Sequence, residues 1–161
     1  MSNRANISHS KPMFEKTRNI AFSIRRKLKM VFLGQLFEIR ANTRPDFPVL
    51  TFENGPYPEA VQTFRDLHEN SHRFARALLD AGLEKGDKYA AIMYNYPEMI
   101  HLMAAASITG AIIVPIDPRT RGQKLAHMIS NSKSKAVFIT ADLLENIEPI
   151  IKDLPQVKHV F

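Results

Sequence analysis

The sequence predicts an α/β fold: a partial, doubly wound and mainly parallel sheet flanked by helices, preceded by an amino-terminal amphipathic helix. Two observations support this prediction. The chain has 161 residues, which suits a single hydrophobic core. Short apolar runs alternate along it with segments whose apolar residues recur at helical spacing. Repeated strand and helix units of this kind favour a parallel sheet that is buried on both faces.

The first predicted elements form a hairpin followed by a helix. A strand is expected in residues 48–53, and an Asn-Gly turn leads to a returning strand in residues 61–63. Thr63 is predicted to be a helix N-cap, because Asp66 follows three residues later, at the spacing of a capping box. The apolar residues that follow lie on one helical face, and Gly82 is expected to end this helix.

The middle of the chain predicts a strand, a helix and a second strand. Residues 84–94 read as a polar turn and a mostly apolar strand. Asn95 is expected to cap the next helix, with Pro97 in its first turn and Gly110 at its end. A strand over residues 111–116 follows.

The last part of the chain predicts two further helices and two strands. The helices are expected in residues 122–130 and 142–154, and the strands in residues 136–140 and 157–161. No helix follows the last strand. Because a bare edge strand favours association, we expect that something else covers it or that the chain is a piece of a longer protein.

The composition excludes several classes of function. Residues 1–44 hold ten lysines and arginines against two glutamates, so this segment carries +8, whereas the rest of the chain carries −2. The globular part is therefore not basic, and no nucleic-acid partner is expected. The absence of cysteine excludes disulfides, thiol nucleophiles and cysteine-ligated zinc.

Residues 1–33 form a basic extension to the globular part, which is expected to cover residues 34–161. Within residues 14–33, apolar side chains recur at helical spacing beside several lysines and arginines. Such a helix could dock on its own domain or a partner subunit, lie on a membrane surface, or belong to a mitochondrial transit peptide. The longest apolar stretch, residues 104–116, is too short to span a bilayer, so a cytoplasmic location is expected.

Two histidines raise the question of a metal site. "HENSH", from His68 to His72, matches the H-E-x-x-H pattern, in which two imidazoles bind zinc and the glutamate is the general base. No third ligand follows at a suitable spacing, and helix-flank histidines are ordinary. We therefore expect no metal site, although a zinc hydrolase stays open as a third class of function.

The stretch "IIVPIDPRTRG", residues 112–122, places two arginines directly after an apolar strand that contains Pro115 and is followed by Pro118. A guanidinium offers paired donors to phosphate, and α/β sheets bind their ligands at the carboxyl ends of strands. Arg119 and Arg121 are therefore candidate binding residues. The alternative is that both are solvated loop arginines.

Four motifs, in order, carry a resemblance to a known family. "TFRDL" looks like a Thr-Tyr-x-Glu-Leu start, "GLEKGDKYAAI" like a Gly-(hydrophobic)-x-x-Gly-Asp turn, "NYPE" like an Asn-Ser-Pro-Glu loop, and "GAIIVPIDPR" like a Gly-Ala-x-x-Val-Pro-(hydrophobic)-(Asn/Asp)-Pro-Arg strand exit. Residues 34–161 resemble the amino-terminal portion of AMP-forming acyl-CoA synthetases, the adenylate-forming ligases. Phe64 and Asp66 depart from the first motif.

The resemblance implies an enzyme that activates a carboxylic acid with ATP and Mg²⁺, releases pyrophosphate and transfers the acyl group to CoA. Arg119 matches the family's arginine that contacts a phosphate of the CoA nucleotide, and Arg121 is a second candidate. The family's phosphate loop and its catalytic lysine have no counterpart in this chain. No catalytic residue is therefore assigned, and we expect the chain alone to be inactive and to bind none of these cofactors tightly.

Other functions stay open at this stage. A non-catalytic binding or oligomerisation module would use the basic helix of residues 14–33 to attach to a membrane or partner, and a homo-oligomer would cover the open sheet edge. Within the ligases, a peptide-synthetase adenylation domain is the nearest rival. The acyl substrate is not predicted, because the residues that shape its pocket in this family lie mainly beyond residue 161.

Overall fold

The computed structural model describes residues 32–53, 55 and 59–161, and this part of the chain forms one compact unit. The basic helix predicted within residues 14–33 falls almost entirely outside the described residues. The elements in chain order are α2 (Leu33–Thr43), β1 (Pro48–Phe52), β2 (Ala60–Thr63), α3 (Phe64–Asp80), β3 (Lys88–Ile92), α4 (Pro97–Thr109), β4 (Ile112–Ile116), α5 (Gly122–Ser132), β5 (Ser134–Ile139), α6 (Leu144–Ile147) and β6 (His159–Val160).

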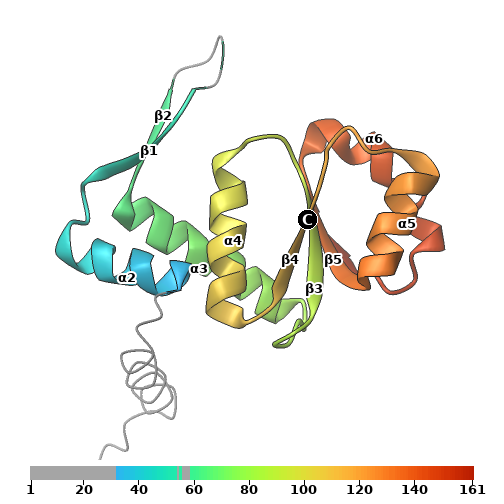
Figure 1. Cartoon of the computed structure of the whole chain (residues 1–161), viewed down its shortest axis with the longest axis horizontal. Helices are drawn as coiled ribbons and strands as arrows, with labels where there is room; N and C mark the ends of the chain where they lie inside the picture. The colour runs from blue at the N-terminus through green and yellow to red at the C-terminus, as the bar shows by residue number, and fades with distance from the viewer. Residues whose placement is uncertain (1–31, 54, 56–58) are drawn as a thin grey trace, which may run out of the picture. The chain divides into compact units, whose positions relative to one another are not determined.

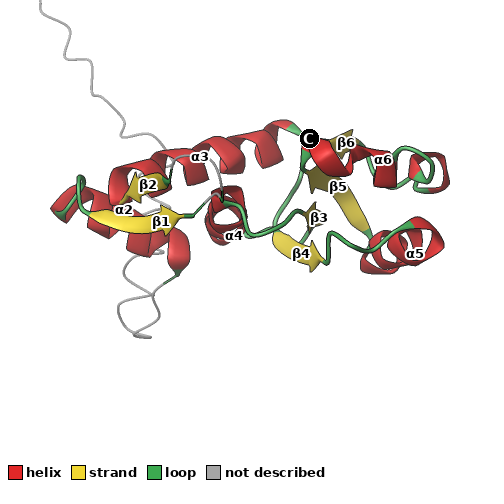
Figure 2. Ribbon diagram, turned by 90° about the horizontal axis from the view of Figure 1, so that it is seen from above, coloured by secondary structure: helices red, strands yellow, loops and turns green. Residues whose placement is uncertain are grey.

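The centre of the fold is a four-stranded parallel sheet in the order β4-β3-β5-β6. Helices α3 and α4 lie on one face of this sheet, and α5 and α6 lie on the other (Figures 1 and 2). This arrangement confirms the predicted doubly wound, mainly parallel sheet flanked by helices. Strands β1 and β2 form a separate antiparallel hairpin, as the sequence predicted.

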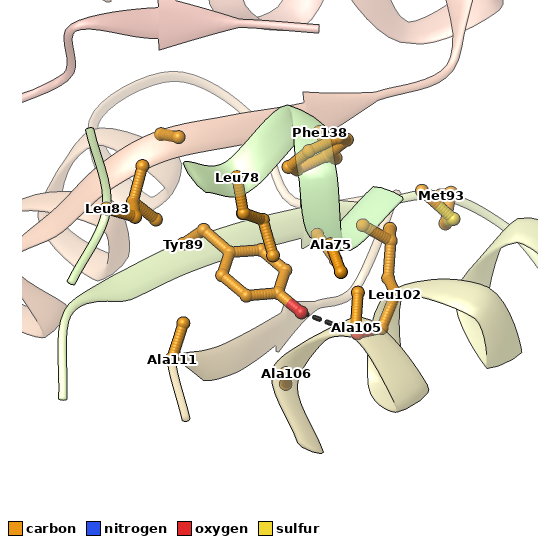
Figure 3. Packing of buried hydrophobic residues seen from close by; sticks show 12 residues of the cluster. Ala75, Leu78, Leu83, Tyr89, Met93, Leu102, Ala105, Ala106, Ala111 and Phe138 are labelled. Atoms are coloured by element: carbon orange, nitrogen blue, oxygen red, sulfur yellow. Dashed lines mark hydrogen bonds between the residues drawn. The ribbon is translucent and has the colours of Figure 1, made fainter. Parts of the chain in front are cut away.

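Each face of the sheet has its own hydrophobic core, because buried parallel strands present apolar side chains on both sides. On the α3 and α4 side, Tyr89 of β3 is fully buried, and its hydroxyl donates a 2.6 Å hydrogen bond to the carbonyl oxygen of Leu102 in α4 (Figure 3). On the α5 side, Leu125 and Ile129 pack against Ile92 and Val137 of the sheet. The strand positions are thereby fixed from both faces.

Helix α3 begins with the capping box that the sequence predicted. The Asp66 N–H donates to Thr63 Oγ1 (3.2 Å), and the Thr63 N–H donates to Asp66 Oδ2 (2.8 Å). Gly82 follows the helix with a φ of +74°, a left-handed conformation that glycine adopts without steric cost.

The prediction for the start of α4 was wrong in one detail. The N-cap is Tyr96 rather than Asn95, and no side chain caps the helix. Pro97 does occupy the first turn, where its missing N–H removes no helical bond, and Gly110 ends the helix with a φ of +79°. The backbone therefore starts this helix without the amide side chain that the sequence suggested.

The single helix expected over residues 142–154 was also wrong. The structure has a 3₁₀ turn (Ala141–Leu143), the one-turn helix α6 and a second 3₁₀ turn (Ile151–Asp153) instead. Pro149 lies between the last two. Proline has no N–H to donate, and its ring clashes with the carbonyl of the preceding turn, so a continuous helix is interrupted there.

The length and composition of the helices show whether any of them could span a membrane. Among the described helices, none combines the length and the apolar character that a bilayer-spanning segment needs.

Candidate functional site

The candidate site lies at the carboxyl-terminal ends of β3 and β4, which pair in parallel and therefore end at the same edge of the sheet (Figure 2). Strand β4 ends at the buried Ile116. Pro115 lies inside β4 rather than ending it. This is compatible with the position of β4 at one edge of the described sheet, where a missing N–H need not interrupt a ladder.

The turn after β4 is built around Asp117. Its main-chain oxygen accepts the Thr120 N–H (2.9 Å), and its carboxylate Oδ1 accepts the Arg119 N–H (2.9 Å). An aspartate that bonds the backbone two residues on forms an Asx turn, and Pro118 between them fixes its own φ. The direction of the chain at Arg119 is therefore set by local bonds.

The side chain of Arg119 is held by the same carboxylate. Arg119 Nε donates to Asp117 Oδ1 (3.0 Å) and Nη2 donates to Oδ2 (2.6 Å), so the pair is bidentate. Both side chains are solvent-exposed, at 81% for Arg119 and 46% for Asp117. The hydrogen bonds from Arg119 are the main reason that the pKa of Asp117 falls to about 2.

The structure separates the two candidate arginines. Arg121 is the exposed N-cap residue of α5, and its carbonyl oxygen accepts the Leu125 N–H (3.4 Å). It makes no hydrogen bond to Asp117 that parallels those of Arg119. Of the two arginines, Arg119 is thus the one whose side chain is held in a fixed orientation, and Arg121 adds a second positive charge to the same turn.

Two further residues at this edge were not found from the sequence. Tyr94 follows β3, is 48% exposed, and lies near enough to Arg119 to add a smaller effect to the rise in the Arg119 pKa that Asp117 mainly causes. Thr140 follows β5, and its buried hydroxyl has no hydrogen-bond partner among the described residues. Thr140 comes directly after β5 and Tyr94 comes two residues after β3, so a polar residue at the end of an apolar run is the signal that could have found both.

A cavity of about 350 Å³ lies beside this edge, between the β1–β2 hairpin and the start of α4. Asn95 and Pro97 line it together with Tyr96, whose ring lies 5.8 Å from that of Phe52. Asn95 and Pro97, which the sequence indicated as helix-start residues, therefore also line a cavity.

The two histidines of "HENSH" lie one turn apart on α3. Their ring centroids are 4.5 Å apart, and burial is the main cause that lowers the pKa of His72. In the described ranges no three His, Cys, Asp or Glu side chains come together as metal ligands. Besides the two histidines, Glu69, Arg73 and Arg76 line the cavity next to the pair, and the two positive charges outweigh the single carboxylate and oppose a metal cation.

Comparison with known proteins shows where this architecture belongs. The family described as "AMP-binding enzyme" matches residues 37–161. Long-chain fatty acid transport protein 6 of Mus musculus is 34% identical over 105 residues, which are 65% of this chain and 17% of that protein. The mitochondrial acyl-coenzyme A synthetase ACSM2A of Homo sapiens is 26% identical over 120 residues, 74% of this chain and 21% of that protein.

A solved structure of an acyl-CoA synthetase is also similar to this chain. A Mycobacterium tuberculosis fatty acyl CoA synthetase superposes with a TM-score of 0.68 at 26% identity, covering 81% of this chain and 26% of that one. The chain spans about a fifth of the length of the two curated relatives named above. Because the family match covers most of the chain, from the middle of α2 to the last residue given, this protein belongs to the AMP-binding enzyme family.

Proposed function

We propose that this chain is the amino-terminal part of a longer ligase, which activates a carboxylic acid with ATP and transfers the acyl group to CoA. The observation that carries the proposal is the family match over residues 37–161. The relatives named above include an acyl-coenzyme A synthetase and a fatty acyl CoA synthetase, and each is several times longer than the matched segment. A fatty acid or another organic carboxylic acid is accordingly the proposed class of substrate.

We assign a CoA phosphate to Arg119 as its ligand. Asp117 occupies the Nε edge of the guanidinium, so the two protons on Nη1 and the outer proton on Nη2 remain available for a second anion. An arginine can bind phosphate through two such donors. The exposure of Arg119 at the carboxyl end of β4 leaves this edge accessible to a nucleotide. Arg121 is the second candidate for contact with the same ligand.

ATP and Mg²⁺ are assigned to the rest of the parent enzyme. Phosphoryl and nucleotidyl transfer need preorganised donors around the phosphates. The six glycines of this chain form neither G-x-G-x-x-G nor G-x-x-x-x-G-K-[ST], so no glycine-rich phosphate loop is present in the sequence. This part of the enzyme is therefore inactive alone in our proposal.

The test is an assay of pyrophosphate release from ATP with the 161-residue chain and with the product of the longer reading frame. We expect activity only in the longer protein, and only when both a carboxylic acid and ATP are supplied, with acyl-CoA formed when CoA is added. A reading frame that stops after residue 161 would overturn the proposal.

A second candidate is a binding or oligomerisation module, favoured by apolar side chains exposed on α2 and the hairpin. Leu36, Ile39, Val49 and Val61 are each at least 36% exposed, although singly exposed apolar residues are common. Light scattering distinguishes this candidate, because self-association predicts a mass that rises with concentration. A monomer mass that is independent of concentration counts against a homo-oligomer.

A further inference from the structure

A third cavity, of about 640 Å³, lies at the amino-terminal ends of the parallel strands, opposite the strand ends that carry Arg119. It is lined at the amino-terminal ends of β5 and β6 by three lysines, Lys133, Lys135 and Lys158. Ser130, Gln156 and the end of α3 complete its wall. A volume of this size is typical of small-molecule sites, and the location is independent of the proposed CoA contact.

The charges at this cavity are unbalanced. Lys135 Nζ lies 2.7 Å from the carboxylate of Asp87, and Lys158 Nζ donates to the carbonyl oxygen of Pro155 (3.0 Å). Lys133 has no ion pair or side-chain hydrogen bond to any residue in the described part of the chain. The lining thus holds three ammonium groups and no carboxylate, and the ion pair of Lys135 with Asp87 offsets one of them, which favours an anionic ligand.

The lysines are not needed to cap the helices that end here. At the end of α5, the carbonyl oxygens of Ile129 and Ser130 already accept the Lys133 N–H. At the end of α3, the Leu79 oxygen accepts the Gly82 N–H (2.9 Å). Backbone groups thus satisfy these carbonyls, so the ammonium group of Lys133 is not needed to cap either helix.

The backbone at Lys133 adds a separate indication. Its φ is +59°, and it is the only residue other than glycine with a positive φ in the described ranges. Left-handed backbone at the end of a helix favours glycine, and a side chain there costs about 1 kcal/mol. A lysine at this position therefore costs stability, and strained residues of this kind often occur at binding sites.

Gln156 provides a further donor at the same cavity. Its Nε2 is buried and has no acceptor among the described residues. An unpaired buried amide is unfavourable, and the terminal torsion of glutamine turns easily. Rotation of this torsion toward the cavity would bring the amide within reach of an acceptor oxygen of a ligand.

From these contacts we propose that the cavity formed by Lys133, Lys135 and Lys158 binds a phosphate monoester. The dianionic phosphate would lie among the ammonium groups, and the organic part would lie against Ala81 and the methylene stems of the lysines. This site is separate from the one at Arg119, because the two lie at opposite ends of the parallel strands.

The experiment is a titration of the ¹⁵N-labelled 161-residue chain with phenyl phosphate at constant ionic strength, followed by NMR. We expect saturable shifts at the amides of Lys133, Lys135 and Gln156, with inorganic phosphate binding more weakly. Lys133→Gly should weaken binding at least tenfold, while its thermal midpoint stays equal or rises, because glycine suits the positive φ. Lys158→Ala should also weaken binding.

The matched control is Lys124→Ala, which removes one positive charge from the exposed amino-terminal turn of the same helix. It should leave the affinity for phenyl phosphate unchanged. Shifts that do not saturate, that affect wild type and Lys133→Gly equally, or that map to the Arg119 turn would overturn the proposal.

Discussion

The guanidinium of Arg119 lies side-on against the carboxylate of Asp117, with Nε and Nη2 each donating to a different oxygen at 3.0 and 2.6 Å. The same carboxylate also accepts the Arg119 N–H, so one side chain fixes both the backbone and the side chain of the arginine. The guanidinium is therefore oriented before any ligand arrives, which reduces the entropy lost on binding.

This orientation predicts the effect of Arg119→Ala in the longer enzyme. Removing one charge-assisted contact at an exposed site should raise KM for CoA about tenfold, equivalent to about 1.4 kcal/mol, and change KM for ATP much less. Steady-state kinetics with each substrate varied in turn measure the difference. Arg76→Ala, which removes an exposed arginine paired with Asp80 on α3, is the control and should change neither value. Equal effects on CoA and ATP would contradict the assignment.

The ion pair also predicts the titration of Asp117. Its pKa is lowered from an ordinary value of 3.8 to about 2, chiefly by the hydrogen bond from the Arg119 side chain. Because the folded pKa lies below the unfolded one, the pair stabilises the fold fully above about pH 4, and this contribution is lost as the pH falls towards 2. The effect on stability is small, since both groups are exposed.

NMR detection of the side-chain carboxyl carbon measures this midpoint directly. We expect a midpoint near 2 in the wild type and a return towards 3.8 in Arg119→Ala. Arg121→Ala should leave the midpoint unchanged, because Arg121 does not bond the carboxylate. A wild-type midpoint close to the ordinary value would show that the pair does not persist in solution.

The close approach of α2 and α4 gives a prediction about Gly34. Its N–H donates to Ser107 Oγ (3.0 Å), and a Cβ at this position would lie 2.6 Å from Ile108 Cγ1. Alanine favours a helix over glycine by about 1 kcal/mol, whereas overpacking costs about 1–3 kcal/mol. We expect the clash to dominate, so Gly34→Ala should lower the free energy of unfolding.

Urea denaturation of four chains tests this balance: wild type, Gly34→Ala, Ile108→Ala and the double variant. Truncation of Ile108 removes the atom that a new Cβ would meet. The Gly34→Ala change should therefore be less harmful, or even stabilising, in the Ile108→Ala background. Strictly additive effects would show that α2 and α4 are farther apart in solution.

Some elements were predictable from the sequence because their signals are local. The start of α3 depends on Thr63 and Asp66, which are three residues apart, and the end of α4 depends on the backbone freedom of Gly110. The break in the helix at Pro149 was equally local, yet the apolar spacing on either side masked it. At Pro149 the loss of a backbone N–H donor interrupts the helix, although the apolar residues on both sides recur at helical spacing.

The geometry of the site was less predictable. The sequence identified Arg119 from its place after a strand, but not its pairing with Asp117, because a side-chain rotamer depends on the turn that surrounds it. Tyr94 was missed for a different reason. Its place after an apolar run was a local signal, but its proximity to Arg119 follows from the parallel register of β3 and β4, which joins residues more than twenty positions apart.

The capping box of α3 predicts a pH-dependent effect of Thr63→Ala. The Thr63 hydroxyl and N–H both donate to Asp66 Oδ2, at 2.7 and 2.8 Å, and these bonds are the main reason that the pKa of Asp66 is lowered. Loss of the hydroxyl also removes the acceptor for the Asp66 N–H (3.2 Å). Cap replacements of this kind cost about 1–2 kcal/mol, so we expect a loss of that size near neutral pH.

Urea denaturation of wild type and Thr63→Ala between pH 7 and pH 3 tests the link between the cap and the charge. The side-chain bond to Asp66 favours the ionised carboxylate, so its contribution is present above the unfolded pKa and is lost as the pH falls through the lowered folded pKa. The difference between the two proteins should therefore shrink with acidification. Thr63→Ser keeps the hydroxyl and should follow the wild type closely. A difference that stays constant over this range would mean that the Asp66 charge takes no part in capping α3.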